Sequence, residues 1–447
     1  MMSDIIPFSE FFTNPIFSIA TIACMLMCFA SSLIGVITFV SRRSLIGETL
    51  AHATYPGVAL ALTIGGLFAK NFEAVFPLAI LVGAFVGGFI GLKAMLYLEE
   101  KLSINSDTAL CFVLSVSLGL GVLLASRLQF SNPVWYQKLQ MLLYGQAATM
   151  LFYHVILYAV LSLLVVFAIV FLFPGMKISY FDPDFASRMG VSQKWIGYTT
   201  KILFVLAVVI GLRSTGVVLL SGMLIAPAVA ARQFSKTLKE MFVWSAIFGT
   251  VSGFLGNYLS VQAGVLLRES YPSLKAGLPT GPLILIVAAF IAFISLLLSR
   301  ERGFIPRLYR IYKFQRKCLL ENILKELYKK EGSLSLKKVR KLYHLSRLKA
   351  YLLVWMLERQ GIWQKKGRSL ELTEKGYKKA ERVVRLHRLW EVYLFDYLGI
   401  DAANVHQSAE EMEHILTPEL EKELTRLLRN PKRDPHNQII PGEGVTV

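Results

Sequence analysis

The sequence predicts an all-α, polytopic membrane half followed by a small soluble half that combines helices with a short β-hairpin. Three observations lead to this prediction. The 447-residue chain is 54% hydrophobic and only 17% charged. Its long apolar runs all lie before residue 299, whereas 31 of its 48 Lys and Arg residues lie in 299–447. With 19 acidic residues among them, this second half carries +12 of the net charge of +18, interspersed as in a folded domain with a basic face.

Apolar runs define the membrane half. A hydrocarbon core about 30 Å thick requires roughly 20 apolar residues in a helix. Six runs satisfy this length and four are weaker or shorter, so we predict eight to ten membrane segments. The stronger runs are 16–40, 74–98, 108–126, 154–173, 242–262 and 278–298, and the weaker runs are 55–69, 139–150, 197–212 and 215–230.

Basic loops predict the orientation, because short connections rich in Lys and Arg stay in the cytoplasm. The basic positions are Arg42 and Arg43 after the first run, Arg232, Lys236 and Lys239 after a later run, and the segment 299–317 after the last run. These positions agree if the first span runs inward and 139–150 does not fully cross. The chain after residue 298 is then expected in the cytoplasm.

Two polar segments of the membrane half have candidate roles. Asp182 and Pro183 predict the start of a short helix in a cytoplasmic loop, because Asp caps helices and Pro suits the first helical position. Glu48 and His52 lie four residues apart, on one helical face. From spacing alone, ordinary interfacial polar residues are the commoner interpretation. The sequence has no GxxxxGK[ST] phosphate loop, so we expect no ATPase site and no enzyme activity in this chain.

Four motifs in order are SLIGETLAHATYPGVALA, FDPDFASRMGV, GVVLLSGMLIAPAVAA and GLPTGPLI. Over roughly residues 15–300 they resemble the membrane permeases of ABC importers for manganese, zinc or iron. The resemblance implies a bacterial inner-membrane protein that works with a second permease subunit, a cytoplasmic ABC ATPase and an extracytoplasmic metal-binding protein. It also implies that FDPDFASRMGV couples to the ATPase, through Asp182, Pro183, Asp184, Ala186 and Gly190. Glu48 and His52 become candidates for the transport path.

The soluble half begins with the pattern of a helix-turn-helix. Two short helices meet at YHLS, and Ser346 is expected to start the second one. A strand, turn and strand then form a basic wing. Such an element can place a helix in the major groove while the wing contacts phosphate, although winged helices also serve as protein-interaction modules. The candidate DNA-binding residues are Ser346, Arg347, Lys349, Tyr351, Lys365, Lys366 and Arg368.

Further along, histidines and carboxylates recur at helical spacing. His387 and Glu391 are four residues apart, as are His406 and Glu410, and Glu413 and His414 continue the second face. Any one pair is commonly a solvated helix pair. Two such groups on neighbouring helices favour a metal site, and a set of Glu and His ligands suits Mn(II) or Fe(II) better than a thiolate site does.

The order of LTEKGYKKAERVVRLHRLWEVYLFDYLG, VHQSAEEMEHIL and RDPHNQIIPG resembles the iron- and manganese-dependent repressors of the diphtheria toxin repressor family, over about residues 318–442. The resemblance implies a tail homodimer that binds operator DNA with a divalent metal as co-repressor, Fe(II) or Mn(II) rather than Zn(II). It implies one metal site of Glu410, Glu413 and His414 and a second or bridging site of His387, Glu391 and His406. First-helix ligands remain open among Cys318, Glu321 and Asn322.

We therefore predict four parts: a membrane permease domain (1–298), a basic linker (299–317), a winged helix-turn-helix (318–376) and metal-binding and dimerisation helices (377–442). The combined hypothesis is a divalent-metal importer permease whose tail represses transcription when loaded with metal. Cleavage in the exposed linker would release a fragment of roughly 130 to 150 residues. The alternative is a tail that senses intracellular metal and gates the transporter without binding DNA.

Overall fold

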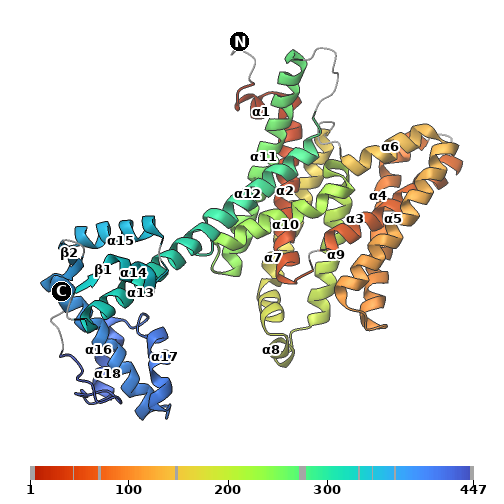
Figure 1. Ribbon diagram of the computed structural model, residues 1–447. Coiled ribbons are helices and arrows are strands. Elements are labelled where there is room, and N and C mark those ends of the chain that lie inside the picture. The colour runs from red at the N-terminus through yellow and green to blue at the C-terminus, as the bar shows by residue number, and fades with distance from the viewer. Residues whose placement is uncertain are drawn as a thin grey trace. The chain divides into compact units, whose positions relative to one another are not determined.

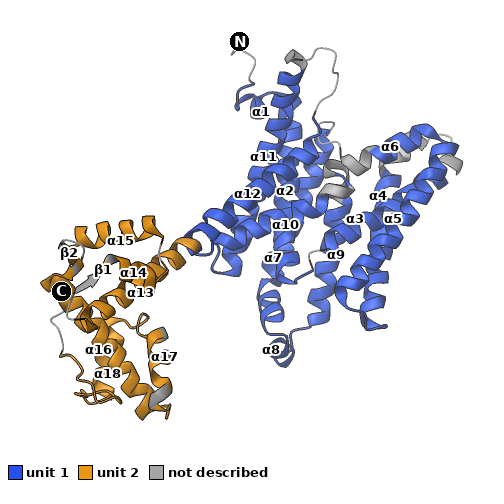
Figure 2. Cartoon of the chain, in the orientation of Figure 1, with its two compact units in different colours: residues 1–307 blue, residues 308–447 orange. Residues whose placement is uncertain are grey.

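The chain folds as two units, residues 1–307 (unit 1) and 308–447 (unit 2), coloured separately in Figure 2. Both are taken from a computed structural model. It describes residues 6–43, 45–68, 72–145, 150–270, 278–330, 333–344, 346–366 and 369–442.

Unit 1 is built of α-helices, in keeping with its apolar runs (Figure 1). In order they are α1 (Glu10–Thr13), α2 (Pro15–Val40), α3 (Ile46–Phe68), α4 (Phe72–Glu100), α5 (Ser106–Ser131), α6 (Pro133–Tyr144), α7 (Phe152–Phe181), α8 (Pro183–Arg188), α9 (Gln193–Thr215), α10 (Val217–Phe234), α11 (Leu238–Ser270) and α12 (Thr280–Leu298).

Five helices among the described residues are long and apolar enough to cross a membrane. They are Pro15–Val40, Leu78–Glu100, Ser106–Ser131, Phe152–Phe181 and Thr280–Leu298. The count of eight to ten segments therefore stays a prediction. In the segment 139–150, α6 ends at Tyr144 and residues 146–149 lie outside the described residues; α6 has 12 residues, too few to span a bilayer.

Small residues bring the helices of unit 1 close together. A Cβ atom on Gly57 of α3 would lie 2.2 Å from the carbonyl oxygen of Gly83 on α4, and one on Gly87 would lie 2.5 Å from that of Ala53. Without side chains at these glycines the two backbones can touch, which is how helices associate where lipid removes the hydrophobic drive. Gly253 of α11 packs in the same way against Cys24 of α2.

Unit 2 combines helices with one small sheet (Figure 1). Its elements are α13 (Phe304–Lys329), β1 (Ser333–Ser335), α14 (Leu336–Leu342), α15 (Arg347–Arg359), β2 (Trp363–Lys366), β3 (Ser369–Leu372), α16 (Glu374–Asp396), α17 (Ala402–Met412) and α18 (Pro418–Leu427). The strands pair antiparallel in the order β1-β3-β2. The segment 299–317, expected as a linker, contains the start of α13 and is helical from Phe304 onward.

The core of the first part of unit 2 follows the helical spacing of its apolar residues. Ile323 and Leu327, one turn apart on α13, are fully buried with Leu357 of α15 and Trp363 of β2. The indole Nε1 of Trp363 donates a hydrogen bond of 3.1 Å to the carbonyl of Val354, so its polar atom is satisfied. Burying one such large side chain stabilises the fold by about 1.5–3 kcal/mol.

The long helix α16 begins at a well-formed cap. The hydroxyl oxygen of Thr373 accepts a hydrogen bond of 3.1 Å from the backbone N–H of Gly376. Farther along α16, Leu389 and Val392 pack with Leu424 of α18. This packing holds α16 in place, and α16 carries the histidine and the carboxylate considered next.

Candidate metal centre

Two packed helices of unit 2 bring the predicted ligands together. His387 and Glu391 lie one turn apart on α16, and His406 lies on α17, which packs against α16. One ligand atom from each of these residues lies within 4.8 Å of the other two. His387 and Glu391 are buried, whereas the His406 side chain is 47% exposed, so the group is open to solvent on the α17 side.

The three ligand atoms converge on one point. Nε2 of His387 lies 2.9 Å from Nδ1 of His406 and 3.1 Å from Oε1 of Glu391, and Nδ1 of His406 lies 2.8 Å from the same oxygen. Two ligands bound at about 2.1 Å to a tetrahedral ion are about 3.4 Å apart. A shift of a few tenths of an ångström in each atom would therefore give these three atoms the separations of metal ligands.

A fourth residue orients His387. Its Nδ1 shares a hydrogen bond with Oε2 of Glu413, whose side chain is 1% exposed. A carboxylate on one ring nitrogen of a histidine leaves the other nitrogen as the metal ligand and raises its basicity. Glu413 thus orients the imidazole of His387, and the direct-ligand role that the family resemblance implies for Glu413 stays a prediction.

Burial and hydrogen bonding set the charges of this group. Burial alone would raise the pKa of Glu391, but hydrogen bonds and charge interactions with His387 and His406 outweigh it and lower that pKa to about 2. Burial also opposes a charged His387, yet its hydrogen bonds with Glu391 and Glu413 raise its pKa above the ordinary value. Glu391 is therefore ionised at neutral pH, which is the form of a carboxylate that can bind a metal ion.

The other predicted ligands are arranged differently. The ammonium of Lys325, on α13, lies 3.1 Å from Oε1 of Glu410 and 3.1 Å from Oε1 of Glu413. His414 instead places its Nδ1 2.7 Å from Oε2 of Glu321 on α13. Lys325 was not among the residues predicted from the sequence; the available signal was its position one helical turn after Glu321.

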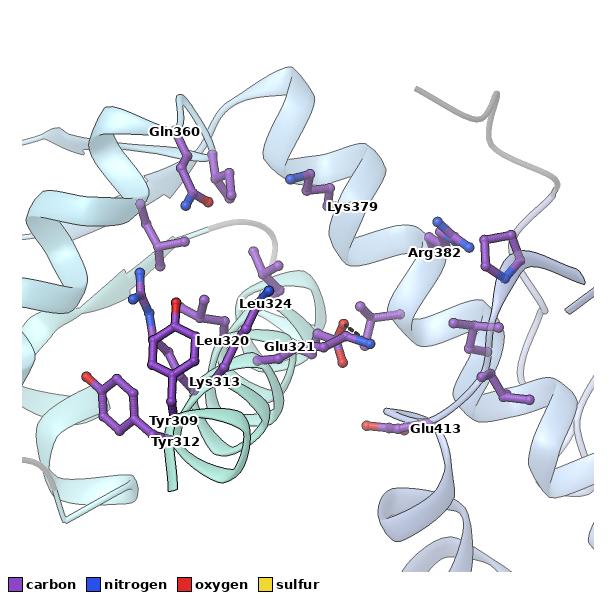
Figure 3. Close-up of a pocket in the computed structure, with 18 residues that line it drawn as sticks. Tyr309, Tyr312, Lys313, Leu320, Glu321, Leu324, Gln360, Lys379, Arg382 and Glu413 are labelled. Carbon is purple, nitrogen blue, oxygen red and sulfur yellow. Dashed lines mark ion pairs between the residues drawn. The ribbon is translucent and has the colours of Figure 1, made fainter. Parts of the chain in front are cut away.

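A cavity of about 560 Å³ borders the candidate metal centre (His387, Glu391, His406 and the residues that contact them) on the side of Glu321 and Glu413 (Figure 3). Residues of α13, α15 and α16 line it, and the carboxylates of Glu321 and Glu413 are part of its wall. Lys317 also lines it and forms an ion pair of 3.7 Å with Glu321.

Comparison with known families identifies both parts of the chain. Residues 14–299 match the model of the ABC 3 transport family. The chain belongs to the ABC 3 transport family. Residues 373–442, which contain the centre described above, match the model of the iron dependent repressor, metal binding and dimerisation domain. This ABC 3 permease therefore carries a metal-dependent repressor domain at its C-terminal end.

Several proteins resemble this ABC 3 family member. It is 33% identical over 442 residues to the probable metal transport system membrane protein of Chlamydia trachomatis, covering 96% of this chain and 97% of that protein. It is 34% identical over 291 residues to the zinc transport system membrane protein TroC of Treponema pallidum, covering 65% of this chain and 90% of the relative. In fold it resembles PsaBC from Streptococcus pneumoniae in complex with Fab, at 23% identity and a TM-score of 0.54, over 68% of this chain and 98% of that one.

Within the permease domain, α8 begins at Pro183 and the side chain of Asp182 caps it by accepting a hydrogen bond of 2.9 Å from the N–H of Phe185. Ala186 is buried, whereas Asp184 is exposed. After the helix, Gly190 has a φ of +74°, which favours glycine.

The candidate transport-path residues lie on one helix. Glu48 is in the first turn of α3 and His52 follows one turn later, half-buried.

The candidate DNA-binding residues lie on and beside α15. Ser346 caps this helix by accepting a hydrogen bond of 3.3 Å from the N–H of Lys349. Ser346, Arg347, Lys349 and Tyr351 are exposed. Lys365 and Lys366 lie in β2, with side chains outside the described structure, and Arg368 lies outside the described residues.

Proposed function

We propose that this chain is the permease subunit of an ATP-driven importer of divalent metal ions and that its tail is a metal-dependent, DNA-binding repressor. Transport would require a second permease subunit, a cytoplasmic ABC ATPase and an extracytoplasmic metal-binding protein, in the inner membrane of a bacterium. The convergence of His387, Glu391 and His406 on one point carries the proposal for the tail, because it supplies the cation site that a metal-dependent repressor needs.

The proposed mechanism gives each side chain one task. Glu413 holds the Nδ1 of His387, so that Nε2 and the carboxylate of Glu391 face the same point. His406 closes the site from α17. His387 and Glu391 of α16 and His406 of α17 would hold a divalent ion, whose positive charge would stabilise the contact between the two helices. The nitrogen and carboxylate donors favour Fe(II) or Mn(II) over Zn(II) by ligand type, although the intrinsic affinity order favours Zn(II).

The exposed start of α15 is the proposed DNA-reading element. Arg347 and Lys349 lie in its first turn with Tyr351 on the next, all exposed, where a helix entering the major groove needs its contacts. The strands β2 and β3 are the proposed wing that contacts phosphate, through Lys365, Lys366 and Arg368. Two tails would form a homodimer that matches the two half-sites of an operator, and a metal ion held by His387, Glu391 and His406 of each tail would favour that arrangement.

The proposed regulation is feedback: incoming metal loads the tail, and the loaded tail lowers transcription of uptake genes. A proteolytic cut between the units would free the repressor to search for its operator. Unit 2 begins at residue 308, so the released fragment would have about 140 residues, a size typical of an independent domain.

The direct test is DNA binding by residues 308–447 to the promoter of the chain's own operon. Binding is measured by fluorescence anisotropy with Mn(II), with Fe(II) under anaerobic conditions, with Zn(II) and with chelator. We expect metal-dependent binding that is lost in His406→Ala. The matched control is His436→Ala, an exposed histidine outside the centre, which is expected to bind like the wild type.

Salt dependence distinguishes DNA contact from indirect effects. Lys365→Ala and Lys366→Ala, which each remove a wing cation, are each expected to reduce the log-log salt slope of binding by about 0.9, the contribution of one phosphate contact. If the tail binds metal but retains no promoter DNA at any salt concentration, the repressor proposal fails. A metal-responsive gate on transport, tested in proteoliposomes, then becomes the better explanation.

A further inference from the structure

The most unusual member of the metal centre is a lysine. Lys325 lies on α13 and is only 4% exposed, although a lysine is seldom buried unless its charge is paired. Its side chain lies between two carboxylates: Glu410 on α17, and Glu413 just after the C-terminal end of that helix. It therefore holds a positive charge at the position where the family resemblance implied a metal ion.

The contacts of the ammonium match those of a bound cation. Nζ of Lys325 donates to Oε1 of Glu410 at 3.1 Å and to Oε1 of Glu413 at 3.1 Å, and lies 3.4 Å from Oε2 of Glu413. The other side of Glu413 is also engaged, because its Oε2 shares a hydrogen bond with Nδ1 of His387. Both oxygens of Glu413 thus have partners within the protein, and one of these partners is a cation.

Two cations cannot share these carboxylates without strong repulsion. A divalent ion bound to Oε1 of Glu410 and Glu413 would lie about 2.1 Å from oxygens that already hold the ammonium. The side chain of Lys325 is enclosed, so the repulsion would be screened far less than at the surface. His414 does not compensate, because its Nδ1 pairs with Glu321 and its Nε2 is 3.8 Å from Glu413.

We propose that the Lys325 ammonium is a built-in cation that replaces one divalent ion at Glu410 and Glu413. The tail then binds a single regulatory ion, at His387, Glu391 and His406, and Lys325 and a second ion exclude each other. This inference rests on the proposed metal-sensing function of the tail. It assigns Lys325 a positioning role: it keeps Glu413 on His387 whether or not metal is bound.

The test counts Mn(II) ions on the full-length chain in detergent micelles, by equilibrium dialysis and electron paramagnetic resonance. The double variant His387→Ala, Glu413→Gln removes one possible ligand from each of the two candidate positions in the tail. The Mn(II) that this variant still binds is therefore assigned to the permease domain and serves as the background. We expect the wild type to exceed this background by about one ion per chain and Lys325→Met to exceed it by about two. Lys325→Arg keeps the charge and is expected to match the wild type.

The electron paramagnetic resonance spectrum of the wild type is an independent test that does not depend on the variants being folded. One Mn(II) in the tail gives an isolated six-line signal, whereas two ions a few ångströms apart couple and broaden it. A coupled signal, or two tail ions in the wild type, overturns the inference while leaving metal sensing intact. A folded Lys325→Met that stays at the wild-type count also overturns it. If the wild type binds no more Mn(II) than the double variant, the proposed metal site itself fails.

Discussion

Replacing Glu413 with glutamine removes one negative charge from the most enclosed point of the metal centre. The Glu413 side chain is 1% exposed and bonds both Lys325 and His387. Removing one partner from a buried ion pair costs about 3–5 kcal/mol, because the other charge is left without compensation. Glu410 still accepts from Lys325 in the variant, and the new amide oxygen accepts one hydrogen bond. We therefore expect a loss near the lower end, about 3 kcal/mol.

The assay is urea unfolding of metal-free residues 308–447, followed by far-UV circular dichroism. With a slope of about 2 kcal/mol/M, a loss of about 3 kcal/mol lowers the unfolding midpoint by about 1.5 M. Glu410→Gln is the matched control, because Glu410 bonds the same ammonium but its side chain is 50% exposed. An exposed ion pair contributes about 0–1 kcal/mol, so this control is expected to shift the midpoint by about 0.5 M or less.

The difference in unfolding midpoint between the two variants measures the effect of burying the carboxylate. Both remove one carboxylate from the same lysine, and only Glu413 is enclosed and shared with His387. Equal midpoint shifts for Glu413→Gln and Glu410→Gln would show that burial of the carboxylate does not determine the loss in free energy of unfolding. A negligible shift for Glu413→Gln would show that the buried network is not formed in the metal-free tail.

Three further predictions concern metal-free unit 2. Its thermal midpoint is expected to peak between about pH 5 and 6.5. The lowered pKa of Glu391 gives stability that is lost as the pH falls toward 2. The raised pKa of His387 gives stability that is lost as the pH rises through that pKa. Glu391→Gln is expected to make the thermal midpoint less dependent on pH below about pH 5. Gly376→Ala is expected to lower the thermal midpoint strongly, because its Cβ would lie 1.9 Å from the carbonyl oxygen of Ile362. Ser346→Ala removes the cap of α15 and is expected to cost about 1 kcal/mol in urea unfolding.

Helical spacing predicted which residues share a face, because that follows from 3.6 residues per turn. His387 and Glu391 meet in this way on α16. Spacing says less about which faces of different helices meet. His406 reaches Glu391 only because α17 packs against α16, and His414 turns to Glu321 on α13, a contact across 93 positions of sequence. Such contacts depend on tertiary packing.

Lys325 shows why part of the centre escaped prediction. In a segment rich in Lys and Glu, a single lysine is normally a solvated surface charge. Its burial follows from tertiary contacts with Glu410 and Glu413, because Ile323 and Leu327, two positions away, lie on the other side of α13. Its two carboxylate partners lie 85 and 88 positions later in the sequence. Composition could place a basic surface in this half, but it could not assign one cation to the interior.

The segment expected as a linker also depends on a feature that its charge does not reveal. The basic charge of 299–317 indicated an exposed segment, and from Phe304 to Phe314 most side chains are exposed. Exposure does not exclude helix, however, because Lys, Arg and Gln are good helix formers. The segment therefore continues into the helix that carries Glu321, and α13 runs unbroken from Phe304 to Lys329.

This helix restricts where a releasing cut can fall. Lys317 donates to the carbonyl of His414 and Glu321 pairs with its imidazole, so a fragment that keeps the centre must begin before Lys317. Proteases bind extended chain, and the exposed first turns of α13 have few buried contacts, so they can open locally at low cost. We therefore predict that mass spectrometry of a C-terminal fragment from the native host finds its first residue between 300 and 316. A fragment that begins after Glu321 would lack part of the centre, and release could not then produce a metal-dependent repressor.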